Sequence, residues 1–569
     1  MKIKHLFGLA VIAAMSASCS SNEDLGTAGP GTGSNETGVG YASFSINLPT
    51  TSGTRAADDP TFENGDANEY KVNDATLLIF KKGATEAEGD YTFVESAELG
   101  SMAPWQKPNP DETGVTTHAK ITAKLEKVNK ADNLFALVLL NNGKGANAKV
   151  YLPSEGDKFS AWNTAAKATD KFVTTDNGFY MANAPLFKTN NVTTLVPIES
   201  SKIYPTEEEA AKNTAIDIYV ERGLAKVTLT GTAEEKKVAG VTYMGDKVTI
   251  KNWALDVTNK NTFPIHNVDG LTTDYEAIWS NTATPTGSND ATTQRFVDNN
   301  QKTIAKRVYW GKDPNYDNKD NDKTALNAEF NYVANANVKE DPAKPLYCLE
   351  NTFNLANMMQ GQTTRVVFKA TYKPASLPEG ETTFYKIGKN TAIWREADLE
   401  QQIKAAVASV VSGAAGKTTV NLNADKNDIT AAGTHYITND NITVTGVETI
   451  SEENIKAINT QLGLKETDKV GISTYASGES YYIARIKHFG DDLTQWKSGA
   501  YGEKNLEYLG RYGVLRNNWY ELKVNSVSGP GYPSVPEVKP NTPDDEDDNY
   551  INVSVKILDW AKRSQSVDL

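Results

Sequence analysis

Histidine and cysteine supply much of the catalytic and metal-binding chemistry of proteins, and this sequence has few of either. Its histidines are scattered, and none has a second ligand at the spacing of a zinc site; they are His5, His118, His266, His435 and His488. The sequence also has no Gly-x-Ser-x-Gly nucleophile motif and no Gly-x-x-x-x-Gly-Lys-Ser/Thr phosphate-binding loop. We therefore expect no enzyme and no catalytic residue.

One polar segment resembles the start of a calcium-binding loop. Asp313, Asn315 and Asp317 occupy the first, third and fifth positions of such a loop. However, Asn318 stands where glycine is required, and Thr324 stands where a bidentate glutamate is required. We interpret the segment as a polar loop and expect no metal ion and no other cofactor.

The composition is that of a folded protein with several domains. The 569 residues exceed one ordinary domain, and 39% hydrophobic residues are sufficient for packed cores. About two to four domains are expected from this length. The formal net charge of −14 disfavours nucleic acid and anionic lipid surfaces as partners.

The first 19 residues have the features of an export signal. Lys2 and Lys4 precede an apolar stretch, Leu6 to Met15, that is too short to span a bilayer. Small residues then lead to Cys19, as in a bacterial lipobox, although Ser16 stands where leucine is usual. We predict a lipoprotein precursor that carries its acyl chains, including palmitate, on Cys19. The alternative is a plain signal peptide with a chance cysteine.

The only other cysteine is Cys348. If Cys19 is lipidated, no intrachain disulfide is available, and we expect Cys348 to be a buried, unreactive thiol. The residues that follow Cys19 are rich in Gly, Thr and Ser up to about Gly40, which indicates a flexible tether.

Beyond the tether, short runs of β-forming residues alternate with turn residues, which is typical of β-sandwiches. The predicted strands are Ala75–Phe80, Leu134–Leu140, Ile216–Val220, Ala225–Leu229, Val248–Val257, Thr364–Tyr372 and Tyr481–Lys487. Apolar residues at helical spacing predict two helices, Glu396–Ser412 and Asn454–Leu462, as insertions packed against a sheet. The predicted fold class is therefore all-β, with two tandem β-sandwich domains and a few short helical insertions.

Changes in composition divide the chain into segments. We predict a signal peptide (1–19), a tether and first strand (20–55), two sandwich domains (56–215 and 216–528), a Pro-rich acidic linker (529–548) and a C-terminal strand segment (549–569). The boundary near 215 follows a polar stretch. The linker combines prolines with a run of acidic residues, so we expect it to be extended and solvated.

Both ends of the chain carry a strand with one apolar face. The alternating apolar residues of the N-terminal strand are Ala42, Phe44, Ile46 and Leu48. Those of the C-terminal strand are Ile551, Val553, Val555 and Ile557. Because the two strands share a period of two and similar apolar content, they could compete for one groove. The alternative is that the C-terminal strand completes the sheet of its own domain.

Arg55 follows the first strand in a small polar loop, which is an accessible site for a trypsin-like protease. Cleavage between Arg55 and Ala56 would detach the lipid anchor and the strand together. The open groove would then be a template for a strand from another chain, and repeated head-to-tail contacts give open filaments. The alternative is that Arg55 is an ordinary loop residue.

Several segments follow one another in an order that matches a known family. They are Val220–Val227, Trp253–Lys260, Tyr347–Thr352, Tyr481–Arg485, His488–Gly490, Tyr512–Tyr520, Val553–Trp560 and Val567–Leu569. Together with the lipobox and Arg55, they resemble the Mfa-type fimbrilins of Bacteroidales, relatives of the FimA-type major fimbrial subunits.

The resemblance implies transthyretin-like sandwich domains, maturation by an Arg-specific protease at Arg55–Ala56, and polymerisation by exchange of a donor strand running from about Ile551 to Trp560. It implies a shaft subunit of a surface fimbria that supports adhesion, biofilm formation and virulence. The implied partners are copies of the same chain in a head-to-tail polymer, anchor and tip subunits, the protease and, in the precursor, the outer membrane through the lipid. No nucleic acid is implied.

Structural interpretations of two of these segments accompany the resemblance to fimbrilins. The charges Arg222 and Lys226 in a strand-opening run are expected to be solvated or paired at the surface, and residues 516–519 to shape a turn.

The alternative function is a fimbrial tip subunit or a surface lipoprotein that binds glycans through exposed aromatic residues. The candidates for that role are Trp105, Trp162 and Trp310. Such a glycan-binding protein would stay monomeric after cleavage at Arg55.

Overall fold

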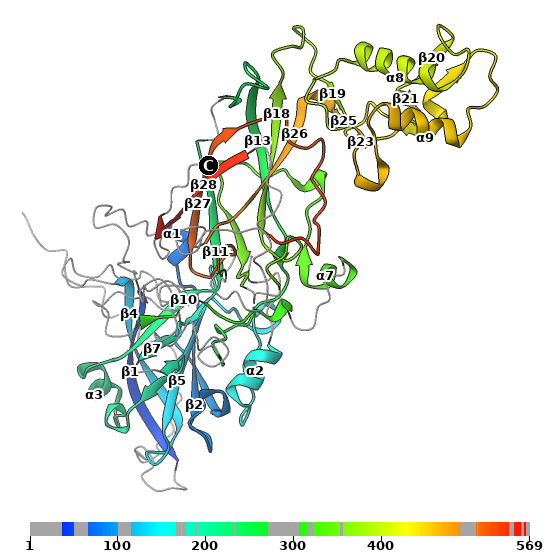
Figure 1. Ribbon diagram of the computed structural model, residues 1–569. Coiled ribbons are helices and arrows are strands. Elements are labelled where there is room, and N and C mark those ends of the chain that lie inside the picture. Colours follow the sequence, from blue (N-terminus) through cyan, green and yellow to red (C-terminus); the bar gives the residue numbers. More distant parts are fainter. Residues whose placement is uncertain are drawn as a thin grey trace, which may run out of the picture.

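The computed structural model contains two β-rich domains and a smaller inserted module, arranged from one end of the molecule to the other (Figure 1). The described residues are 37–49, 67–100, 115–166, 172, 178–188, 191–231, 235–270, 306–308, 310–316, 323–352, 357–488, 508, 510–544, 551–558 and 563–564. In these residues, every helix is too short or too polar to cross a membrane.

The N-terminal domain is built on one eight-stranded sheet of order β3-β2-β5-β6-β10-β1-β4, with β9 paired to β5. The strands are β1 Gly38–Pro49, β2 Ala75–Lys81, β3 Thr92–Glu98, β4 Val115–Val128, β5 Leu134–Leu140, β6 Met181–Asn183, β9 Val196–Ile198 and β10 Ile216–Arg222. A small sheet of β15-β7-β8 and three helices lie beside it. These are β7 Leu186–Lys188, β8 Asn191–Thr193, β15 Lys306–Arg307, α1 Ala67–Tyr70, α2 Phe159–Ala165 and α3 Glu207–Lys212.

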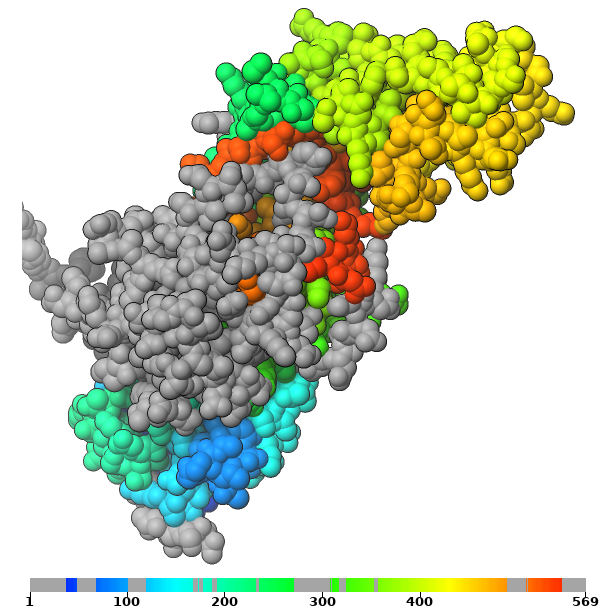
Figure 2. All heavy atoms as spheres, in the orientation of Figure 1, coloured from blue at the N-terminus to red at the C-terminus, as the bar shows by residue number. Residues whose placement is uncertain are grey.

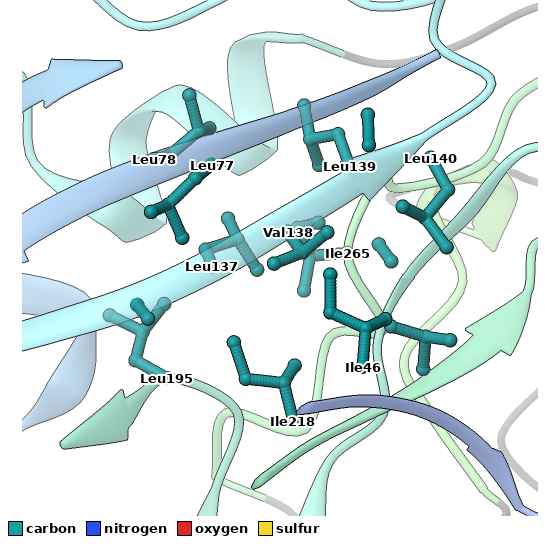
Figure 3. Close-up of a cluster of buried hydrophobic side chains, with 14 of the residues drawn as sticks. Ile46, Leu77, Leu78, Leu137, Val138, Leu139, Leu140, Leu195, Ile218 and Ile265 are labelled. Atoms are coloured by element: carbon teal, nitrogen blue, oxygen red, sulfur yellow. The ribbon is translucent and has the colours of Figure 1, made fainter. Parts of the chain in front are cut away.

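The strands of this domain enclose one apolar core. Figure 3 shows Ile46 of β1 and Ile218 of β10 on the same side of β5 as Val138. All three side chains are fully buried. The first strand of the chain is therefore part of the core and not a surface appendage.

The C-terminal domain is a sandwich of two sheets, β17-β11-β27-β28-β29 and β12-β13-β18-β26. The strands are β11 Leu224–Thr230, β12 Lys236–Lys237, β13 Lys247–Asp256, β17 Leu346–Leu349, β18 Arg365–Lys373, β26 Glu479–Arg485, β27 Trp519–Val527, β28 Ile551–Leu558 and β29 Arg563–Ser564. Trp253 and Phe368 of one sheet and Leu522 of the other belong to a single buried cluster. A short ladder of β14 (Thr258–Asn259) with β16 (Phe330–Asn331) and helix α7 (Lys323–Glu329) completes the domain.

The chain passes from the first sheet to the second at Gly223, eight residues beyond the position 215 at which the sequence places the boundary. The polar stretch after Thr206 forms α3. The Thr206 side chain caps that helix by accepting a hydrogen bond from the Glu209 backbone N–H. A Cβ at Gly223 would lie 3.0 Å from the Phe172 ring, so the crossover point is tightly packed.

The inserted module comprises residues 384–475 and contains both predicted long helices. They are α8 (Glu396–Val410) and α9 (Glu452–Gln461). The module strands are β19 Phe384–Ile387, β20 Thr418–Val420, β21 Asn423–Ala424, β22 Asn427–Asp428, β23 Gly433–His435, β24 Ile442–Val444 and β25 Ile472–Tyr475. The two helix predictions are confirmed.

The strand predictions are confirmed as well. Each of the seven predicted strands corresponds to one observed strand, namely β2, β5, β10, β11, β13, β18 and β26, within two residues at either end. The all-β fold class is also confirmed, because sheets build both domains and the long helices are confined to the module.

The Pro-rich segment before the C-terminal strand differs from expectation. Residues 529–544 are packed along the C-terminal domain and are not a solvated linker. The Tyr482 hydroxyl donates to the Gly529 carbonyl at 2.8 Å, and Arg365 donates to the Pro536 carbonyl at 2.7 Å. Asp544 is fully buried and accepts a hydrogen bond from the Thr363 hydroxyl. Prolines are compatible with this course because each lacks only its own N–H group, and the N–H groups of Tyr532, Val535 and Asp544 still donate to the domain.

Candidate assembly site

Strand β1 is an interior strand of the N-terminal sheet. It pairs antiparallel with β4 along its whole length, from Gly38 opposite Val128 to Pro49 opposite Val115. It also pairs in parallel with β10, where Phe44 to Asn47 lie opposite Ile216 to Tyr219. In the described part of the chain, β1 alone joins β4 to the remainder of the sheet.

The four residues predicted for the released strand are brought together in the core. Ala42, Phe44 and Ile46 have no exposed surface, and Leu48 is 1% exposed. Burial of three large apolar side chains at roughly 1.5–3 kcal/mol each, with about 0.8 kcal/mol for the alanine methyl, stabilises docking by about 5–10 kcal/mol. This is the gross value before the ordering entropy of the strand is subtracted.

The opposite face of β1 is covered too, which the alternation of the sequence does not predict. The Ser43 hydroxyl donates to the Ala210 carbonyl in α3 at 2.8 Å and lies 2.7 Å from the Thr122 hydroxyl oxygen on β4. Lys120 on β4 donates to the Asn213 carbonyl at the end of the same helix, at 3.0 Å. Helix α3 therefore closes a slot that β1 fills.

Removal of β1 would expose hydrogen-bonding groups on two strands at once. The facing edges of β4 and β10 would lose their partners, and the core behind Phe44 and Ile46 would open to water. Unpaired backbone groups beside an apolar surface form a strong template for an added β-strand.

The C-terminal strand lies in the other domain. Strand β28 pairs antiparallel with β27, and among the described residues its other side is paired with the two residues of β29. The predicted donor residues Ile551, Val553, Val555 and Ile557 lie opposite Val527, Val524, Leu522 and Tyr520 of β27, which are at most 1% exposed. Directly opposite residues of an antiparallel pair share a face of the sheet, so the predicted donor residues occupy the core-side positions.

In the isolated chain, the C-terminal strand thus completes its own sheet, and the two matched strands are not brought together (Figure 1). The other predicted site residues lie outside the described residues. These are the lipidation site Cys19, the cleavage residues Arg55 and Ala56, and the donor-strand residue Trp560.

A buried ion pair joins the two domains. Lys226 of β11 lies 2.6 Å from the carboxylate of Glu69, which belongs to α1 of the N-terminal domain. Both side chains are at most 3% exposed. The Tyr347 hydroxyl donates to Glu69 at 2.5 Å, and the Lys226 ammonium lies 3.9 Å from the centre of the Trp519 ring.

A second buried cluster continues this junction. His266 Nδ1 lies 2.9 Å from the Glu221 carboxylate of β10, and Arg516 donates to the Glu350 carboxylate of the C-terminal domain at 2.8 Å. His266 Nε2 lies 3.6 Å from Glu350, so the imidazole stands between carboxylates of both domains. Charged groups in a dry interface have defined positions, so these pairs fix how one domain sits on the other.

The expectation that Arg222 and Lys226 lie at the surface is wrong. They are 2% and 3% exposed, and Arg222 donates to the Glu69 carbonyl and to the Asn517 side chain. Burial is tolerated because partners from distant parts of the chain satisfy both charges. No local pattern could reveal these partners, since Asn517 is 295 residues away in sequence.

The proposed aromatic glycan contacts are also corrected. Trp162 and Trp310 are each 2% exposed, and the Trp162 indole donates to the Tyr151 carbonyl at 2.9 Å. They are core residues, while Trp105 lies outside the described residues. Aromatic rings bury large apolar areas, so they are usually found in protein cores.

The calcium-like segment and the single internal cysteine have structural roles. The Asp313 carboxylate accepts hydrogen bonds from the backbone N–H groups of Asn315 (2.8 Å) and Thr352 (3.2 Å), so it holds a polar loop. Cys348 is buried, and burial raises the pKa of its thiol to about 12. The prediction that this thiol is buried is confirmed.

The fold defines a class, namely a two-domain β-rich protein whose N-terminal strand lies inside one sheet and whose C-terminal strand is docked on the other domain. Residues 473–566 match the family model described as major fimbrial subunit protein type IV, fimbrillin, C-terminal. This match supports a fimbrillin-type subunit. It begins inside β25 and includes β26, β27 and β28.

One solved structure is similar in part, a crystal structure of a fimbrial assembly protein from Parabacteroides distasonis. The two chains share 12% sequence identity over 39% of this chain and 65% of that chain, so the match spans about two thirds of the length of the solved protein. The TM-score is 0.23. No curated protein matches the chain.

Proposed function

We propose that this chain is a shaft subunit of a surface fimbria. It is exported as a lipoprotein precursor, cleaved after Arg55, and polymerised when the C-terminal strand of one copy replaces β1 in the next. The role is structural and requires no catalysis. The fimbrillin match at residues 473–566 supports a fimbrial subunit, and the lipidation, the cleavage and the strand exchange are the proposal.

The observation that carries the proposal is the position of β1. An N-terminal strand that ends at Pro49 fills a two-sided slot between β4 and β10, and Arg55 follows six residues later. Protease cleavage there would leave the slot without a covalently attached occupant. The precursor would then be self-complemented and the mature subunit would be open.

Strand exchange would also improve the pairing of the C-terminal strand. In its own domain β28 has one long neighbour, β27, and the two-residue β29. In the slot it would have β4 along one side and β10 along the other, with the apolar core beneath. Additional backbone pairing and apolar burial would offset the entropic cost of association.

The C-terminal arm has the length and attachment that such an exchange needs. The chain is held to its domain as far as Asp544, which accepts the Thr363 hydroxyl at 3.0 Å. Six residues, 545–550, then lead to Ile551 and span at most about 20 Å when extended. Only this short arm and the strand need to leave the domain, so neighbouring subunits would sit close together.

The proposal is tested with soluble precursor that begins at Ser20, before and after limited cleavage by an Arg-specific protease. Size-exclusion chromatography and negative-stain electron microscopy measure assembly, and N-terminal sequencing identifies the new end. We expect monomers before cleavage, and ladders or filaments that begin with Ala56 afterwards. A cleaved product that has lost β1 and stays monomeric would refute the shaft role.

The matched controls are two arginine variants. Arg55→Ala should block both cleavage and assembly while the precursor stays folded. Arg395→Ala removes an arginine that is paired with Glu381 on the exposed surface of the module, and it should assemble like the unmodified chain. Filaments from Arg55→Ala would show that cleavage is not the trigger.

A further inference from the structure

The inserted module is placed where a ligand could reach it. Strands β18 and β26 are paired neighbours, and Thr371 lies opposite Glu479 at the end where the module is inserted. The module therefore takes the place of a hairpin connection. It protrudes at the end of the molecule away from β1 (Figures 1 and 2), and Lys469 of the module pairs with Glu537 of the C-terminal domain.

The two connecting strands form a short stalk. Strands β19 and β25 pair with each other, so the chain enters and leaves the module side by side. The rings of Phe384 and Tyr475 stack at 4.4 Å between centroids and belong to the core of the C-terminal domain. Their neighbours Tyr385 and Ile472 belong instead to the core of the module.

The module has a hydrophobic core of its own. Leu399, Ile403 and Val407 lie one turn apart on α8 and are fully buried against Ile458 of α9 and the small sheets. An insertion with a separate core is a structural unit with its own surface. Its presence is not needed to close the sandwich, because β18 and β26 already pair directly.

A cavity of about 430 Å³ opens on this unit, a size in the range of small-ligand sites. One wall is the end of β23 and the segment that follows it, with His435 and Tyr436. The other is helix α9, with Glu452 and Lys456, and Glu466 lies beyond it. Desolvation and the nearby negative charge of Glu466 raise the pKa of Tyr436, so these two groups lie close to each other.

The first wall is held by asparagine side chains and, at His435, by the pairing of β23 with β25. Asn459 accepts from the Ile437 N–H and donates to the Ile437 carbonyl, both at 2.9 Å. Asn427 donates to the Tyr436 carbonyl at 2.7 Å. His435 Nε2 donates to the Ala431 carbonyl at 2.8 Å, which leaves Nδ1 as an acceptor in the neutral ring. The wall is thus preorganised, which lowers the entropic cost of binding.

Three charged side chains line the cavity. Within the described part of the chain, the side chains of Glu452, Lys456 and Glu466 make no hydrogen bond or ion pair. Two carboxylates disfavour an anionic ligand, and only two lining residues, Ile437 and Ile455, are aliphatic, which disfavours a lipid chain. Hydroxyl, amide and carboxylate groups around one aromatic ring suit a ligand that is rich in hydroxyl groups.

We propose that this cavity binds a neutral sugar unit of a glycan, with the Tyr436 ring against the sugar and the carboxylates of Glu452 and Glu466 accepting its hydroxyl hydrogens. This function is independent of polymerisation. On a shaft subunit, the module would repeat a weak site along the fibre, and repetition strengthens binding to a multivalent surface.

The test uses full-length soluble precursor and four neutral disaccharides: lactose, cellobiose, mannobiose and N,N′-diacetylchitobiose. Saturation-transfer NMR titration measures binding to the unmodified chain and to Glu452→Gln, Glu466→Gln and Tyr436→Ala. The matched control is Glu453→Gln, because Glu453 is exposed in the same turn of α9 and does not line the cavity. Spermidine and inorganic phosphate serve as cationic and anionic probes.

We expect at least one disaccharide to bind, with at least tenfold weaker affinity in each cavity variant and unchanged affinity in Glu453→Gln. Circular dichroism establishes that each variant is folded. Binding of none of the disaccharides, binding of spermidine or phosphate alone, or sugar binding that survives all three cavity substitutions would each overturn the proposal. The assembly assay above is unaffected by any of these outcomes.

Discussion

Replacement of Glu69 by alanine should destabilise the protein strongly. The substitution removes the carboxylate that lies 2.6 Å from the Lys226 ammonium at the junction of the two domains. It also removes the acceptor of the Tyr347 hydroxyl. Lys226 would remain buried, and its ammonium group would keep its contact with the face of the Trp519 ring.

The expected loss is about 3–5 kcal/mol in the free energy of unfolding, since removal of one member of a buried pair leaves the other charge desolvated. The contact of Lys226 with the Trp519 ring, at 3.9 Å, reduces the loss towards the lower limit. The matched control, Glu381→Ala, breaks the Arg395–Glu381 pair, whose side chains are 44% and 41% exposed. That pair should contribute less than about 1 kcal/mol.

The assay is urea denaturation of the soluble precursor at pH 7, followed by tryptophan fluorescence and far-ultraviolet circular dichroism. A double variant, Glu69→Leu with Lys226→Met, removes both charges and should regain at least half of the loss, because two apolar residues leave no unpaired charge. A loss below about 1 kcal/mol for Glu69→Ala, equal to that of Glu381→Ala, would refute the interpretation of the junction as a fixed, dry interface.

Three other results are expected. Val555→Asp should abolish assembly, because it places an unpaired charge at a core-side position of the donor strand. The control Ser554→Asp, one position along, should assemble. Filaments from both variants, seen by electron microscopy, would show that the donor lies elsewhere. Gly531→Ala should lower the thermal unfolding temperature more than Gly446→Ala, since both have positive φ but only at Gly531 would a Cβ lie 2.5 Å from a carbonyl oxygen of β26. Cys348 should resist alkylation at pH 9 until the chain unfolds, because its pKa is raised to about 12. The folded state keeps a proton that the unfolded state loses above about pH 9, so raising the pH further should lower the stability of the protein. Rapid alkylation of the folded protein would contradict the burial of this thiol.

The features that follow local periodicity could be predicted from the sequence. The alternation of Ala42, Phe44, Ile46 and Leu48 indicates a strand with a buried face, and the spacing of Leu399, Ile403 and Val407 indicates a helix. Such patterns result from the geometry of a single element. They therefore identify the element without reference to the rest of the chain.

The features that depend on distant partners could not be predicted in this way. The charges of Arg222 and Lys226 suggest exposure, and only the fold shows that Glu69 and Asn517 satisfy them. The prolines of residues 529–544 suggest a solvated linker. The side chains that bind the carbonyls of this segment belong to other strands, so the local sequence does not indicate these contacts. Likewise, nothing in the sequence of α3 indicates that it covers the polar face of β1.

The most direct test of strand exchange is a cryo-electron microscopy reconstruction of filaments grown from the cleaved precursor. Strand exchange predicts that the slot between β4 and β10 holds residues 551–557 of the neighbouring subunit, joined through residues 545–550 to its C-terminal domain, and that no density for β1 remains. A filament in which β1 still fills the slot, or in which residues 551–557 stay paired with β27 of their own subunit, would contradict it.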